Sequence, residues 1–231
     1  MTNDFLSSVP EFFYDLLGLF LPGIVTIELA LVSPLFSQSE LAQRLNGLQT
    51  FERILFILTC GYIVGQLLAG VSDLLVRKPV WLLFGEPAEA LLGKRNALLN
   101  SRPRAFEESF LRTLESELEA ISPGSLASHQ RHSLLDICEQ YIRQKDQVLG
   151  MLCQKRHAVL VMCRNMTLAT FLMLPLYWSF GNLARFLIVL CGIFLFVRWN
   201  YLRTRRAELL YRTFHLTFSG ENSKSASARV P

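Results

Sequence analysis

The stretch Ile54–Val76 reads ILFILTCGYIVGQLLAGVSDLLV and is the clearest indication of the fold, because it is long and apolar. No charged residue lies between Ile54 and Ser72. A helix of this length matches a hydrocarbon core of about 30 Å. The sequence therefore predicts a membrane-spanning helix here.

One edge of this predicted helix carries small residues four apart, at Gly61, Gly65 and Ala69. In lipid, small residues allow a second helix backbone to approach closely. We therefore expect this helix to lie at the centre of a membrane bundle, with the row used for helix packing and for assembly of a homo-oligomer. A gating role for the row is the alternative, and it requires the row to face a pore.

Composition agrees with a membrane protein. The chain has 231 residues, of which 51% are hydrophobic and 18% are charged, whereas soluble domains contain roughly 25% charged residues. The five cysteines include no C-x-x-C pair, so neither a disulfide framework nor a cysteine metal site is expected. This length allows a few spans and one modest domain outside the membrane.

Apolar runs predict an all-α integral membrane bundle of four transmembrane helices. The first span covers about 12–32 and is expected to kink at Pro22-Gly23, because proline removes a helix hydrogen bond. The domains that follow are a first transmembrane hairpin (1–80, spans 12–32 and 54–76), a helical cytoplasmic insertion (81–157), a second transmembrane hairpin (158–200, spans 158–178 and 183–197), a basic juxtamembrane helix (201–218) and a disordered tail (219–231).

The insertion has helical periodicity. Between Pro103 and Ile121, apolar residues recur at helical spacing with glutamates largely off that face. A second helix is expected to begin near Leu126. No proline lies between Ser125 and Leu174, so this helix is expected to run unbroken into the third span and to couple the cytoplasmic domain to the membrane mechanically.

Basic residues indicate the orientation. Twelve of the 23 Lys and Arg lie between Arg77 and Arg156, and seven lie between Arg198 and Arg229. Positive residues flanking spans stay in the cytoplasm. We therefore expect a multi-pass protein of the bacterial inner membrane with both termini and the insertion in the cytoplasm.

Several charged residues fall within or beside the predicted spans, where a charge is costly unless it is paired or faces water. Glu28 and Arg185 are expected at similar depth toward the outer side, where an ion pair is possible. One interpretation is that most of these charges reach the headgroups and bind lipid; another is that they form a polar seam lining a water path. The five residues are Asp15, Glu28, Asp73, Arg164 and Arg185.

The segment WNYLRTRRAELLYRTF, residues 199–214, combines arginines with aromatic and aliphatic residues. Such a helix next to a span is expected to contact anionic lipid, and nucleic-acid binding is unlikely there. The lipid-contacting residues predicted here are Arg198, Arg203, Arg205, Arg206 and Arg212.

Motifs for catalysis are missing from the sequence. The chain has no G-x-S-x-G, no Walker loop and no H-E-x-x-H. We therefore expect no enzyme activity, no catalytic residue, no metal and no cofactor.

Three runs carry a resemblance: FYDLLGLFLPG (13–23), GYIVGQLLAGVSDLLVRKP (61–79) and CRNMTLATFLMLPL (163–176) with the basic segment after it. Together they resemble a pattern in uncharacterised bacterial four-span inner-membrane proteins. The layout is also similar to that of membrane components of anti-phage systems such as Kiwa, CBASS and Pycsar. That similarity implies that a cytoplasmic event is coupled to a membrane protein.

Three functions follow as hypotheses. The favoured one is a non-enzymatic, oligomeric sensor or membrane-perturbing effector in anti-phage defence, which receives a partner or signal at residues 86–155. The second is an anchor that recruits a cytoplasmic partner enzyme. The third is a small ion-coupled transporter or channel that uses Glu28.

Overall fold

The computed structural model describes residues 14–87, 91, 106–121, 132–177 and 181–227, and these are helical with short connections and no strand. The all-α prediction is confirmed. The chain divides into two compact units. Unit 1 comprises residues 1–79 and 155–202, and unit 2 comprises residues 80–154 and 203–231.

The N-terminal part of unit 1 is a helix with an irregular first half. A π-helix, η1 (Tyr14–Phe20), leads directly into α2 (Leu21–Val32). Pro22 lies at the start of α2, so the irregularity falls one turn before the Pro22-Gly23 position at which the sequence predicts a kink. Two short helices follow, α3 (Pro34–Ser37) and α4 (Glu40–Asn46).

The central stretch of the sequence forms α5 (Thr50–Ser72), which continues through a π-helical turn, η2 (Asp73–Arg77), into α6 (Lys78–Phe84). A capping box starts α5, because the Gln49 N–H donates to the Glu52 carboxylate at 3.3 Å. Gly85 follows α6 with a φ of 74°, a left-handed conformation that glycine adopts without strain.

Three helical segments are long and apolar enough to cross a membrane: Asp15–Val32, Thr50–Leu83 and Gly181–Gly220. They include three of the four predicted spans and identify a membrane protein. The predicted third span falls on α10 (Gln147–Met173), which is not among these segments.

Helix α10 buries polar side chains together with apolar ones. No residue from Ala158 to Thr170 is exposed, and Asn165 and Thr167 are fully buried. In contrast, α5 buries one row, Gly61, Gly65, Leu68 and Ser72, and exposes most of its apolar side chains. A helix enclosed by other helices need not be apolar on every face, which explains why its hydropathy is lower. The most enclosed helix of unit 1 is therefore α10, where the sequence predicted α5.

Unit 2 has a conventional hydrophobic core. It contains α8 (Glu108–Ile121), α9 (His132–Lys145), the start of α10 and the end of α11 (Gly181–Ser227). Residues 88–90, 92–105 and 122–131, part of the segment predicted to receive a partner, lie outside the described residues. The fully buried core side chains are Leu114, Leu118, Cys138, Ile142, Leu210, Tyr211 and Phe214.

Two helix boundaries differ from the sequence prediction. The helix expected to run from Leu126 into the third span is broken at Asp146, whose carboxylate accepts hydrogen bonds from the N–H groups of Val148 (2.9 Å) and Leu149 (3.0 Å). An aspartate cap of this kind starts a new helix, so α9 ends and α10 begins. The turn is tight, since a Cβ at Gly150 would lie 3.0 Å from the Arg143 Cα.

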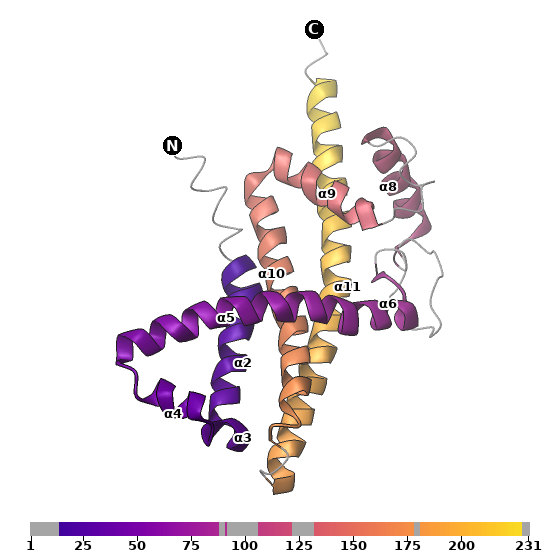
Figure 1. Cartoon of the computed structure of the whole chain (residues 1–231). Helices are drawn as coiled ribbons and strands as arrows, with labels where there is room; N and C mark the ends of the chain where they lie inside the picture. The colour runs from indigo at the N-terminus through magenta and orange to yellow at the C-terminus, as the bar shows by residue number, and fades with distance from the viewer. Residues whose placement is uncertain (1–13, 88–90, 92–105, 122–131, 178–180, 228–231) are drawn as a thin grey trace. The chain divides into compact units, whose positions relative to one another are not determined.

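At the C-terminal end, α11 includes both the fourth predicted span and the basic helix, and it continues to Ser227 (Figure 1). The sequence prediction placed a disordered tail from Ser219 onward. No proline lies between Ser219 and Ser227 to remove a backbone donor, so the hydrogen-bonding ladder continues.

Candidate functional site

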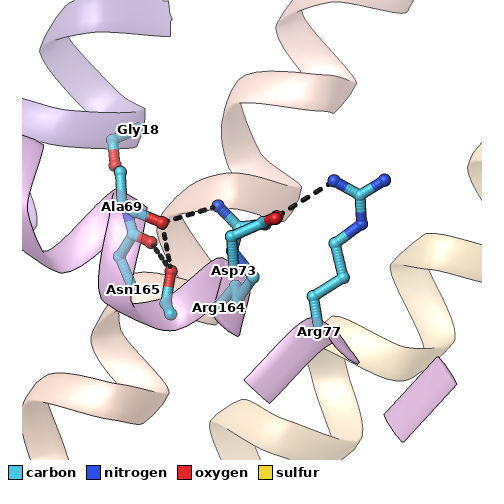
Figure 2. Close-up of polar contacts among 7 residues, drawn as sticks. Gly18, Ala69, Asp73, Arg77, Arg164 and Asn165 are labelled. Carbon is cyan, nitrogen blue, oxygen red and sulfur yellow. Dashed lines mark hydrogen bonds and ion pairs between the residues drawn. The ribbon is translucent and has the colours of Figure 1, made fainter. Parts of the chain in front are cut away.

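The candidate site is a polar cluster inside unit 1, centred on Asn165 of α10 (Figure 2). The Asn165 side chain is fully buried. Its amide nitrogen donates to the carbonyl of Gly18 at 2.7 Å, and its Oδ1 accepts from the Ser72 hydroxyl at 2.6 Å. One side chain therefore joins η1, α5 and α10.

The carbonyl of Gly18 cannot have the backbone donor that a regular α-helix would give it. In an α-helix it would accept from the N–H four residues later, but that residue is Pro22, which has no N–H. An unpaired buried carbonyl costs about as much as a lost hydrogen bond. Asn165 donates a hydrogen bond to this carbonyl, and the packing of η1 against α10 keeps it in reach, since a Cβ at Gly18 would lie 3.5 Å from Val161.

An ion-pair cluster lies beside Asn165. Arg164 donates from Nη1 to the Asp73 carboxylate at 2.7 Å, and Arg77 donates to the same oxygen at 2.9 Å (Figure 2). Arg164 Nη2 also lies 3.4 Å from the carbonyl of Ala69. The Arg164 side chain is only 9% exposed. Because two guanidinium groups share one carboxylate, the cluster carries a net positive charge.

The small-residue row is occupied within the chain. A Cβ placed on Gly23 would collide with the Gly61 carbonyl and would lie 2.7 Å from the Gly65 nitrogen. A Cβ on Gly65 would collide with the carbonyl of Leu19. The two buried glycines of the row therefore pack α5 against η1 and α2, and Ala69 is half-buried beside them. This face has no room for a second copy of the chain.

The remaining residues of the predicted polar seam do not join the cluster. Asp15 is exposed, and Glu28 and Arg185 are half-buried. Within the described part of the chain, Glu28 forms no ion pair, so the considered Glu28–Arg185 pair is not made. Of the five residues, the structure brings Asp73 and Arg164 into contact.

The predicted lipid-contacting arginines fall into two groups. Arg206 pairs with Glu139 at 2.5 Å, with side chains only 16% and 17% exposed, and Arg203 donates to the Gly85 carbonyl at 3.2 Å. Both contacts belong to the interior of unit 2. The exposed members are Arg198, Arg205 and Arg212.

Unit 2 also holds a cluster that the sequence did not predict. The buried Glu117 carboxylate lies 2.9 Å from His215 Nδ1 and accepts from the Ser219 hydroxyl at 3.2 Å. Glu117 belongs to a helix rich in glutamate, so its residue type does not distinguish it from the exposed glutamates of that helix. Its spacing from the buried Leu114 and Leu118 is the available signal, because it places Glu117 on the inner face.

The described residues include no group of three or more His, Cys, Asp or Glu placed to hold a metal ion. The hydrogen bonds and the ion pair of the unit 1 cluster join η1, α5, η2 and α10. Comparisons with family models, with curated proteins and with solved structures gave no match to this chain.

Proposed function

We propose that this protein is a non-enzymatic membrane component that couples an event at unit 2 to the state of the helices of unit 1. In this proposal it acts as a sensor or membrane-perturbing effector of bacterial anti-phage defence. The observation that carries the coupling is the continuity of α10 and α11, since each is one unbroken helix that contributes residues to both units.

Each helix has a buried anchor in either unit. In α10, Cys153 is buried in the core of unit 2, and Arg164 and Asn165 form the cluster of unit 1. In α11, Tyr211 lies in the core of unit 2, and Gly192 packs against Phe171 of unit 1. A signal that binds two arrangements of these helices unequally shifts the population between them.

The proposed topology has four spans in the bacterial inner membrane, with both termini and unit 2 in the cytoplasm. In this arrangement α10 provides the third span, and η1, α5 and α11 shield its polar side chains from lipid. The distribution of Lys and Arg supports the orientation. The exposed arginines of α11 contact anionic headgroups, and unit 2 offers the surface for a cytoplasmic partner or signal.

The defence role is tested by challenging cells that carry the gene, with its neighbouring genes, with a panel of phages while a dye reports membrane potential. We expect fewer plaques than in cells without the gene. Asp73→Asn is expected to abolish protection, because it removes the charge that Arg164 and Arg77 share. Glu108→Gln is the matched control, since it removes an exposed pair with Arg112 of little energetic value. Full plaque numbers across the panel would contradict the proposal.

An anchor that recruits a soluble partner is the second candidate. Exposed acidic residues on and before α8, Glu107, Glu108 and Glu119, favour it, and so does the dense pairing of the unit 1 cluster. Purification of the full chain from its native membrane separates the two functions. A bound protein partner with no change in membrane potential on phage challenge favours the anchor.

A further inference from the structure

The side of α5 that faces away from α2 carries one polar residue of unusual position. Gln66 lies near the middle of Ile54–Val76 and is exposed. At about 1.5 Å per residue it lies about 18 Å from Ile54, deep in a hydrocarbon core of about 30 Å. Lipid tails offer this carboxamide no hydrogen-bond partner.

The chain itself satisfies only part of Gln66. Its Nε2 donates to the Tyr62 hydroxyl at 3.0 Å, whereas a carboxamide has two donor and two acceptor positions. Other polar side chains of α5 form hydrogen bonds within unit 1. Thr59 donates to its own helix at Leu55 (2.9 Å), and Ser72 pairs with Asn165. A polar group left unpaired in an apolar medium costs several kcal/mol.

We infer that Gln66 marks a self-association face, on which α5 of one copy packs against α5 of a second copy with the two carboxamides hydrogen-bonded to each other. A carboxamide is both donor and acceptor, so it is complementary to itself about a twofold axis. Two copies inserted with the same topology bring the same residues to the same depth. The second copy thus completes the hydrogen bonding that lipid and the chain leave open.

The surface around Gln66 allows a second helix to approach the backbone of α5 closely. Gly70 is one turn further along the same side, and a Cβ on Gly70 would meet nothing within 4 Å. This backbone is therefore open, unlike that of Gly61 and Gly65, which α2 and η1 already cover. The inference assigns the homo-oligomer to this side of α5, and it rests on the proposed membrane insertion of α5.

The test is oxidative cross-linking of the full chain in native membranes, with Cys60 and Cys191 changed to Ala. We expect Gly70→Cys to form a disulfide-linked dimer and Leu67→Cys, which is exposed on another side of the helix, to form far less. Adding Gln66→Leu to Gly70→Cys is expected to weaken association about tenfold, and Gln66→Asn is expected to retain part of it. Single-molecule counting of labelled subunits in phosphatidylethanolamine–phosphatidylglycerol vesicles gives an independent measure.

Equal cross-linking at residues 67 and 70, no dimer, or dimerisation unchanged by Gln66→Leu would overturn the inference. Membrane insertion is measured separately by extraction with alkaline carbonate. If alkali releases the chain from the membrane, both the proposed function and the self-association face are contradicted. If the chain stays inserted but monomeric, only the self-association face is contradicted.

Discussion

The two halves of α11 differ in whether their large apolar side chains are exposed or buried. In unit 1, Phe194 is 66% exposed and Leu183 is 72% exposed. In unit 2, Phe214 and Tyr211 are fully buried. One uninterrupted helix thus exposes most of its large apolar side chains in one half, where Trp199 is nevertheless buried, and encloses a core of them in the other, where Leu216 is nevertheless exposed. This difference supports the proposed topology, in which lipid surrounds the first half and water surrounds the second.

The largest expected effect is on the water-adapted half. Phe214→Ala should lower the stability of unit 2 by about 3–5 kcal/mol, because it leaves a cavity among fully packed side chains. The midpoint for thermal loss of protease resistance, measured on the purified full chain in detergent, should fall by more than about 10 °C. Phe194→Ala is the matched control. An equal fall in both variants would contradict the two-solvent comparison.

A second prediction concerns helix packing in unit 1. Gly65→Ala should destabilise the chain by about 1–3 kcal/mol or more, because the new methyl group meets the backbone of Leu19, which cannot yield as a flexible side chain does. Gly70→Ala adds the same group in open space and should be neutral or slightly stabilising, because alanine favours helix more than glycine. The measurement is thermal aggregation in detergent. If Gly65→Ala has no effect on stability, the close approach of α5 to η1 is contradicted.

A third prediction tests the buried polar cluster. Asn165→Leu should cost about 1–3 kcal/mol, because it leaves the Gly18 carbonyl without the donor that replaces Pro22. Thr170→Val is the control, since the Thr170 hydroxyl bonds to Met166 of its own helix at 2.7 Å. Denaturation of the purified chain in detergent mixtures compares the two. Similar small losses would show that the cluster contributes little to holding the helices together.

The smallest expected effect concerns the reactivity of the Cys138 thiol in unit 2. Burial raises the pKa of the Cys138 thiol far above its ordinary value of 9.0, so it stays protonated and unreactive. Raising the pH from 7 to 9 should leave Cys138 unlabelled by iodoacetamide, whereas an exposed Ser116→Cys should label roughly fiftyfold faster at pH 9 than at pH 7, because the thiolate fraction of an ordinary thiol rises by about that factor.

The sign for stability follows from the same pKa difference. The folded state keeps the Cys138 proton at a pH where the unfolded chain loses it, so this thiol's contribution is complete below pH 9.0 and is lost as the pH rises above it. Labelling of Cys138 at pH 9 without denaturant would place it outside the core.

Residue-level predictions succeeded where one residue's neighbours are fixed by its own helix, and failed where they are not. The spacing of Gly61 and Gly65 predicted a helix-packing row, but it did not identify Leu19 and Gly23 as the backbone that these glycines meet. The arginines of α11 looked alike in sequence. Only the position of Glu139 on α9 separated Arg206 from the exposed ones.

From the sequence alone we could predict the all-helical class and the apolar spans at 12–32, 54–76 and 183–197, because hydropathy and helix propensity depend on local composition. The third predicted span, 158–178, lies on α10 and is not among the apolar segments. The tertiary structure decided which helix is enclosed. Helix α10 is not among the segments that are long and apolar enough to cross a membrane, yet it has no exposed residue from Ala158 to Thr170. The physical reason is that a buried polar side chain is stabilised by particular partners, here Gly18, Ser72 and Asp73. Those partners are remote in sequence, and packing alone brings them together.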